Sequence, residues 1–148
     1  MQTTDRRIEG TAYEISMAQD RLDLALVTTF LSGESYWAAG RPADVIARSI
    51  VGSDVFGVYD GAGEQAGFAR LVTDRATFGW VCDVFVLPAH RSLGLGKALL
   101  DAVTDHADEL GITRLMLATA DAHDLYDQFG FAPLAAPARW MERKLEVS

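Results

Sequence analysis

The chain has 148 residues, 49% of them hydrophobic, which suits one globular domain with a full apolar core. A formal net charge of −8 argues against a nucleic-acid-binding protein, because phosphate contacts need a basic face, and mildly favours a small cationic partner. The single cysteine, Cys82, excludes a disulfide framework and a cysteine-based metal site, and no apolar stretch is long enough to span a membrane.

These features lead us to expect a soluble, cytoplasmic protein without a metal. The first ten residues, MQTTDRRIEG, contain no apolar run of the kind found in a secretory signal. The three histidines show no metal-ligand spacing with carboxylates. Cys82 lies in an apolar run, where a small buried side chain is the simplest interpretation.

The first third of the chain predicts one strand and two helices. Residues 11–16 alternate well enough for a strand, and Asp20 can cap a helix that runs to about Leu31. Pro42 then begins a second helix, which extends to about Val51.

The loop between those helices, residues 32–42, carries two aromatic side chains beside Gly and Ser. Tyr36, Trp37 and Arg41 could line a substrate pocket. Alternatively, the two rings only close the edge of the core. The sequence leaves both interpretations open.

The middle of the chain predicts three antiparallel strands, over residues 54–59, 66–73 and 80–87. Pro88 ends the third strand, and a helix follows from Leu95 to Leu110, with Gly111 as its stop. Residues 114–118 then form a short apolar strand, which should lie parallel to the strand before the helix. A crevice is expected where these two parallel strands diverge.

A glycine-containing turn, residues 91–97, joins the third strand to the long helix. A Walker A loop is excluded, because Arg91 stands where its first glycine belongs and Ala98 follows Lys97. A dinucleotide fingerprint fits poorly, because no glycine follows Gly96 at the spacing of its third glycine. The turn is therefore a phosphate site built from helix N–H groups, or a tight connection in which glycine serves geometry alone.

A second motif lies in residues 119–133. A short helix from about Ala122 to Phe129 ends at Gly130, and a strand is expected to begin at Phe131.

Together the two motifs resemble the GCN5-related N-acetyltransferase (GNAT) family. Residues 84–96 match V-x-V-x-P-x-x-R-x-x-G-x-G, and residues 122–131 match A-x-x-x-Y-x-x-x-G-F. The resemblance implies an α/β (α+β mixed) fold, a single domain with a mixed six- or seven-stranded sheet that is splayed at its centre and carries helices on both faces. It also implies transfer of an acetyl group from acetyl-CoA to an amine of a small molecule or peptide, by direct attack.

The resemblance also assigns site residues. The pantetheine arm of coenzyme A would lie along Val84, Phe85 and Val86, and Tyr126 would donate its phenolic proton to the sulfur. Main-chain N–H groups would hold the pyrophosphate; these belong to Arg91, Ser92, Leu93, Gly94, Leu95, Gly96 and Lys97. This chain departs from the family at Thr119, where many members have Asn, and at Ser92, where Gly is frequent.

The general base has two candidates. Asp83 lies in an apolar run, where a carboxylate should either face an active-site cavity or have a partner such as Arg70. Glu34 is the second candidate, and solvent could also take the proton.

Two other functions remain open on the sequence. A non-catalytic acyl-CoA-binding or sensory module would keep the residue 91–97 turn without using Tyr126. The chain could also be an interaction subunit, and the segment from Arg139 onward could form a last strand that pairs across a homodimer.

Overall fold

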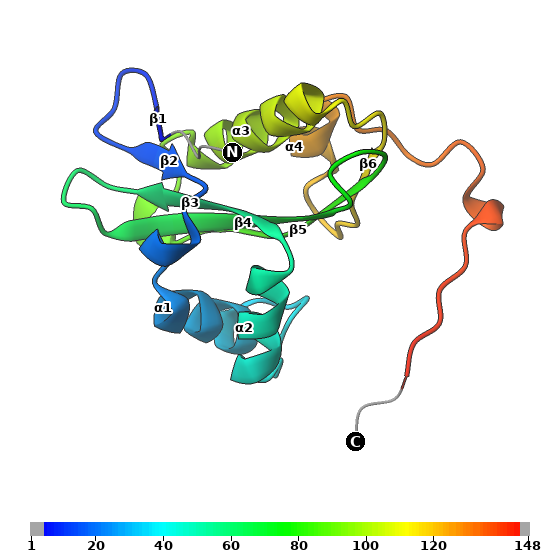
Figure 1. Cartoon of the computed structure of the whole chain (residues 1–148), viewed down its shortest axis with the longest axis horizontal. Coiled ribbons are helices and arrows are strands. Elements are labelled where there is room, and N and C mark those ends of the chain that lie inside the picture. The colour runs from blue at the N-terminus through cyan, green and yellow to red at the C-terminus, as the bar shows by residue number, and fades with distance from the viewer. Residues whose placement is uncertain (1–4, 146–148) are drawn as a thin grey trace.

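The computed structural model describes residues 5–145, which form a six-stranded mixed sheet with helices on both faces. The strands lie in sequence order, and their bounds are β1 (Arg6–Arg7), β2 (Glu14–Ser16), β3 (Asp54–Tyr59), β4 (Gln65–Thr73), β5 (Gly79–Val86) and β6 (Leu115–Met116). The helices are α1 (Leu24–Thr29), α2 (Ala43–Val51), α3 (Leu95–Leu110) and α4 (His123–Asp127). Figure 1 shows α1 and α2 on one face of the sheet and α3 and α4 on the other.

The sheet is splayed where β5 meets β6. Strands β1 to β5 pair antiparallel, whereas β6 is parallel to β5 after the α3 crossover, as the sequence predicts. The β5–β6 pairing joins only Gly79 to Leu115 and Trp80 to Met116, although β5 continues to Val86. The two strands therefore separate toward their carboxyl ends, and a crevice opens there.

Two apolar clusters hold the layers together, one on each face of the sheet. Leu99 and Val103 of α3 pack on one face together with Phe56 of β3. On the other face, Phe30 stacks on Phe85 of β5 with ring centroids 4.1 Å apart. None of the helices within residues 5–145 combines the length and apolar character that a membrane crossing requires.

Two predicted elements, the first helix and the first strand, differ from the structure at their ends. Asp20 lies in a 3-10 turn (Gln19–Arg21), and the cap of α1 is Asp23, whose carboxylate accepts a hydrogen bond from the Leu26 N–H at 3.0 Å. After α1 the chain continues in a π-helical turn, Phe30–Glu34. The first predicted strand shrinks to β2, because a turn at residues 9–12 precedes it.

The strand predicted from Phe131 is wrong for the described chain. Residues 131–136 form no strand hydrogen bonds with a neighbour. Gly130, which precedes them, is left-handed, as expected of a residue that ends a helix. From there the chain leaves the domain and extends away from it (Figure 1).

Candidate active site

A β-bulge in β5 shapes the crevice. Phe68 of β4 pairs with Phe85, whereas Arg70 pairs with Cys82, so that two residues of β5 face the single residue between them on β4. One of these two is Asp83, whose φ of 54° is left-handed and rare for a residue with a side chain. The bulge turns β5 away from β6 and aims the Asp83 carboxylate at the loop that precedes α2.

Asp83 is buried and accepts hydrogen bonds from three donors, two in the loop that precedes α2 and one in β4. Its Oδ1 accepts from Trp37 Nε1 at 2.9 Å. Its Oδ2 accepts from Arg41 Nη1 at 3.0 Å and from Arg70 Nε at 2.9 Å. The side chain is only 1% exposed, and the Arg70 partner predicted for it is confirmed. Two of the three donors are guanidinium groups, and these contacts favour a positioning role for Asp83 over that of a general base.

The two aromatic side chains of the loop, Trp37 and Tyr36, make different contacts. Trp37 is tied to Asp83 and lies beside Phe30, with ring centroids 6.5 Å apart. Tyr36 is 61% exposed, and its hydroxyl accepts from the Ala120 N–H at 3.3 Å and donates to Asp121 at 3.5 Å. The loop therefore reaches the segment that follows β6.

A cavity of about 880 Å³ occupies the crevice beneath this contact. The four predicted substrate residues, Glu34, Tyr36, Trp37 and Arg41, line it together with Arg70, Arg91, residues 80–86 of β5, residues 118–122 and Tyr126. The structure thus brings the predicted acceptor residues, Asp83 and Tyr126 to one cavity. Among residues 5–145 the guanidinium of Arg41 bonds only Asp83, and Glu34 is exposed.

Tyr126 lies on α4, half-buried, with its ring packed edge-on against Phe131 at 5.9 Å. Within residues 5–145 no group forms a hydrogen bond with its hydroxyl. Burial raises the pKa of Tyr126, and the nearby Tyr36 and Asp121 add to that rise. The phenol is therefore held in its protonated form, free to donate.

Thr119 also has a defined role in this region. Its hydroxyl oxygen accepts hydrogen bonds from the N–H groups of Ala122, at 3.1 Å, and Asp121, at 3.4 Å. It therefore holds the entry into α4, the helix that carries Tyr126.

The turn between β5 and α3 presents a row of unpaired main-chain donors. No acceptor within residues 5–145 bonds the N–H groups of residues 92–97. Ser92 and Gly94 have φ values of 67° and 79°, which curve the backbone so that successive N–H groups form a concave anion site. A Cβ added at Gly94 or Gly96 would meet nothing within 4 Å, so the space in front of the turn is open.

Several predicted cofactor residues can contribute only main-chain groups. The side chain of Phe85 is buried against Phe30, and Leu95 is buried in the core. Val84 and Val86 are half-buried and pack on the α3 cluster. Arg91 Nε donates to the Val86 carbonyl at 2.9 Å, which fixes the turn to the end of β5.

Sequence reasoning missed two contacts beside these groups. The Tyr13 hydroxyl bonds His90 Nδ1 at 2.8 Å, next to the turn. Arg70 also donates to the Ser53 hydroxyl at 3.0 Å, which steadies the guanidinium that faces Asp83. Both contacts join residues distant in sequence, and no local spacing signals them.

The profile of the acetyltransferase (GNAT) family matches residues 27–131. A protein named as an acetyltransferase in Gibberella zeae is 30% identical over 133 residues, which cover 77% of this chain and 75% of that protein. A solved structure from Xanthomonas campestris, named as an acetyltransferase of the GNAT family, is 43% identical with a TM-score of 0.86, covering 90% of this chain and 93% of that one. The N-acetylglutamate synthase of Neisseria gonorrhoeae, solved with coenzyme A and N-acetyl-glutamate, shares the fold at 20% identity and a TM-score of 0.66, over 79% of this chain and 27% of that one.

Proposed function

Because the chain belongs to the acetyltransferase (GNAT) family, we propose that it transfers an acetyl group from acetyl-CoA to a primary amine of a small molecule or peptide, by direct attack. The enzyme acts in the cytoplasm, where a lone cysteine such as Cys82 stays reduced. Acetyl-CoA supplies a thioester, whose acetyl carbon is the electrophile.

The residues present fit this cofactor. The unpaired N–H groups of residues 92–97 and the positive end of the α3 dipole suit a diphosphate. The free edge of β5 beyond Trp80 suits an extended arm with amide groups, which can pair with main chain as a strand would. That arm would lead from the turn toward Tyr126.

In the reaction, the amine nitrogen forms a bond to the acetyl carbon, and the carbon–sulfur bond breaks with its electron pair moving to sulfur. Tyr126 gives its phenolic proton to that sulfur and regains one from water. Main-chain N–H groups near the Asp83 bulge stabilise the negative charge that develops on the acetyl oxygen.

The amine must lose a proton, and we assign its acceptor to Glu34 or to solvent rather than to Asp83. Glu34 lines the cavity from an exposed position and forms no ion pair with any of residues 5–145. Asp83 instead holds Trp37 and Arg41 in the acceptor wall. Arg41 directs its remaining guanidinium nitrogens to the acceptor.

One observation carries the proposal. The cavity under Tyr36 contains both the Tyr126 phenol, which has no hydrogen-bond partner among residues 5–145, and the splayed edge of β5 that leads to the donor-rich turn.

Replacing Tyr126 with Phe tests it. We expect coenzyme A affinity to persist while the turnover number falls about a hundredfold, because the departing sulfur loses its proton donor. Free-thiol release with a panel of polyamines, aminoglycosides, amino acids and peptides measures turnover, and calorimetry measures binding. Tyr59→Phe is the matched control, since Tyr59 lies outside the cavity lining and its buried hydroxyl has no hydrogen-bond partner within residues 5–145. A wild-type chain that binds coenzyme A but acetylates no amine in the panel would favour the non-catalytic module.

A further inference from the structure

Two guanidinium groups share one carboxylate in the catalytic cavity, the cavity of about 880 Å³ in the crevice. Arg41 Nη1 and Arg70 Nε both donate to Oδ2 of Asp83, at 3.0 and 2.9 Å. The other oxygen, Oδ1, accepts from the neutral indole of Trp37. The cluster therefore holds two positive charges against one negative charge, and one positive charge is left over.

This excess positive charge is largely withdrawn from water. The side chain of Arg41 is 26% exposed and that of Arg70 is 13% exposed. The cavity lining includes two further acids, Glu34 and Asp121, and within residues 5–145 neither forms an ion pair with these guanidinium groups. A mostly buried charge without a counter-charge costs free energy, which an anionic ligand would offset.

Arg41 has the hydrogen-bond donors that such a ligand needs. Within residues 5–145 its side chain bonds only Asp83, through Nη1, so Nε and Nη2 remain available. These two nitrogens form one edge of the guanidinium fork, the shape that accepts a carboxylate through two parallel hydrogen bonds. Arg70 has less to offer, because its Nη1 already donates to the Ser53 hydroxyl at 3.0 Å.

A carboxylate matches the cluster in both charge and shape. It carries one negative charge, which equals the charge left over, whereas a phosphate monoester carries about 1.5 to 2 negative charges at pH 7 and would leave an excess beside Asp83. The rings of Tyr36 and Trp37 line the same cavity and offer apolar surface to a short carbon chain. The cavity therefore suits an amine whose carbon chain also bears a carboxylate.

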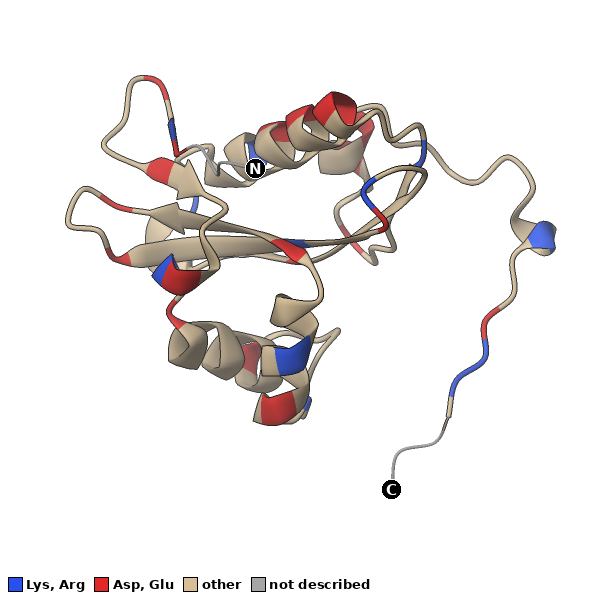
Figure 2. Cartoon of the chain, viewed as in Figure 1, with Lys and Arg blue, Asp and Glu red and all other residues tan. Residues whose placement is uncertain are grey.

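The overall charge of −8 does not decide which ligand this cavity binds. Much of that charge lies on the exposed side of α3, which covers the face of the sheet opposite α1 and α2 (Figures 1 and 2). The acids of α3 are Asp101, Asp105, Asp108 and Glu109. Exposed charges farther apart than about 8 Å are largely screened at physiological salt, so the charges inside the cavity dominate recognition.

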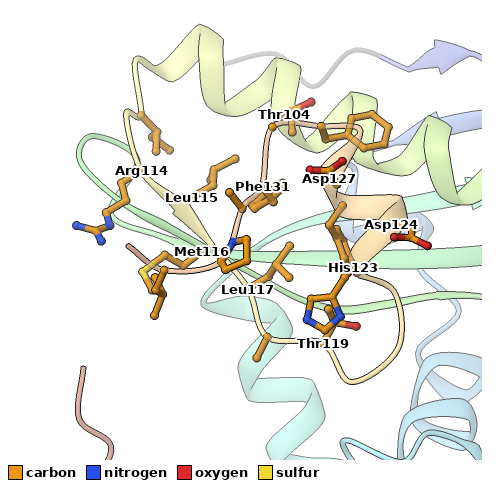
Figure 3. A pocket seen from close by; sticks show the side chains of 18 of the residues that line it. Thr104, Arg114, Leu115, Met116, Leu117, Thr119, His123, Asp124, Asp127 and Phe131 are labelled. Atoms are coloured by element: carbon orange, nitrogen blue, oxygen red, sulfur yellow. The ribbon is translucent and has the colours of Figure 1, made fainter. Parts of the chain in front are cut away.

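A second cavity, of about 850 Å³, lies between residues 112–119 and residues 129–134 and has the opposite charge. Three aspartates line it, Asp108, Asp124 and Asp127. Its guanidinium group, that of Arg114, lies over the Trp140 ring at 4.6 Å and points away from the labelled aspartates in Figure 3. An anionic acceptor is therefore favoured in the catalytic cavity and disfavoured in the second cavity.

We propose that the acceptor amine also carries a carboxylate, which Arg41 binds, so that the enzyme acetylates an amino acid. Arg41 is then the residue that determines specificity, and Asp83 positions its guanidinium. Arg70 supplies the second positive charge. With its carboxylate at Arg41, the acceptor can direct its amine along the cavity toward Tyr126, which lines the same space. This inference rests on the proposed function, which it narrows to one class of acceptor.

Paired acceptors test the proposal. Each member of a panel of L-amino acids, β-alanine and 4-aminobutyrate is compared with its carboxamide, which keeps the size and removes the negative charge. We expect kcat/KM for the best amino acid to exceed that for its carboxamide at least about tenfold. Phosphoethanolamine tests phosphate as the anion. Equal kcat/KM for acid and carboxamide, or a preference for phosphoethanolamine, overturns the proposal while acetyl transfer itself stands.

Arg41→Gln identifies the group that reads the carboxylate. We expect the ratio of kcat/KM between acid and carboxamide to fall close to one, because the charged fork is lost. A merely structural role of Arg41 would lower both values together and leave the ratio as in the wild type, which contradicts the proposal. Arg48→Gln is the matched control and should keep the wild-type ratio, since Arg48 is 75% exposed on α2 and lies outside the cavity lining.

A binding measurement separates this inference from the proposed function. With coenzyme A present, calorimetry compares the N-acetyl derivative of each amino acid with its carboxamide. An N-acetyl amino acid whose affinity falls at least about tenfold in Arg41→Gln supports the carboxylate site even if no amine is acetylated. If none of the N-acetyl amino acids binds, the inference fails, and acetylation of a polyamine by the same protein would show that the proposed function survives.

Discussion

Asp83 is the residue that joins the two walls of the catalytic cavity. It lies at the bulge of β5, and its carboxylate binds Trp37, Arg41 and Arg70. The bulge and the ion pairs therefore act together: the left-handed backbone aims the carboxylate, and the carboxylate fixes the loop.

Replacing Asp83 with Asn should lower the free energy of unfolding by about 3 kcal/mol, because two guanidinium groups would lose their shared counter-charge in a mostly buried setting. Urea denaturation measures the change. Asp101→Asn on the exposed face of α3 is the control and should change it by less than about 0.5 kcal/mol. A loss as small as the control's would mean that Asp83 does not hold the loop.

Tyr126 should keep its proton at alkaline pH. Burial disfavours the phenolate and raises the pKa above the ordinary value of 10.0, so the proton donor stays intact through that pH and is lost only above it. Ultraviolet titration of phenolate absorbance, taken as the difference between wild type and Tyr126→Phe, isolates this group. A midpoint below 10.0 in that difference would contradict the buried setting.

At the scale of residues, local spacing predicts single groups better than it predicts their partners. The motif spacing marks Tyr126 and the turn from Arg91 to Lys97, because these residues lie within one strand–turn–helix unit and one short helix. The Trp37–Asp83 bond joins residues 46 positions apart in sequence and cannot be deduced from either neighbourhood. Even so, an acid in an apolar strand required a partner, and Arg70 on the neighbouring strand is one.

At the scale of elements, we propose that the N-terminus of α3 is the end that binds the cofactor. Its cap is Gly94 in a left-handed conformation, without a side-chain cap, so the N–H groups of the first turn stay available to a ligand. A charged side chain at this position should therefore act on the ligand rather than on the fold.

Gly94→Glu should abolish coenzyme A binding, because its carboxylate would meet the diphosphate in the open space before the turn. Gly94→Ala is the matched control: it has the same left-handed backbone, with a strain of about 1 kcal/mol, but no charge. Calorimetry measures binding of each, and thermal unfolding verifies the fold. Equal coenzyme A affinity in Gly94→Glu and Gly94→Ala would show that the diphosphate does not bind at this turn.

Helices and strands with a sustained period of apolar residues could be predicted from the sequence, and the other elements could not. The long apolar stripe of α3 and the alternating run of β5 gave their types and nearly their ends. The sequence pattern predicts Asp20 as the cap of the first helix, whereas the cap of α1 is Asp23. Both acids precede apolar residues at helical spacing, so the pattern does not distinguish them. The strand expected at Phe131 is absent because a strand needs a neighbour, and the described chain leaves the second cavity beside it open.

At the scale of the whole molecule, the splay of β5 from β6 organises both cavities. The catalytic cavity opens on the β5 side, and the second cavity lies along the outer edge of β6. Tyr126 stands between them and borders each. The antiparallel middle strands and the parallel return after α3 were predictable from the order of strand and helix patterns, whereas helices on both faces were implied by the resemblance to the family. That the Tyr126 phenol borders both cavities could not be predicted from the sequence, because it depends on the tertiary structure.

We propose that main-chain donors at the start of α3 bind the diphosphate of coenzyme A and direct its sulfur to Tyr126. The most direct test is a crystal structure of the full chain grown with coenzyme A. We predict diphosphate oxygens within hydrogen-bond distance of the N–H groups of residues 92–97, and the sulfur beside the Tyr126 hydroxyl. A diphosphate bound elsewhere, with those N–H groups facing solvent, would contradict the account.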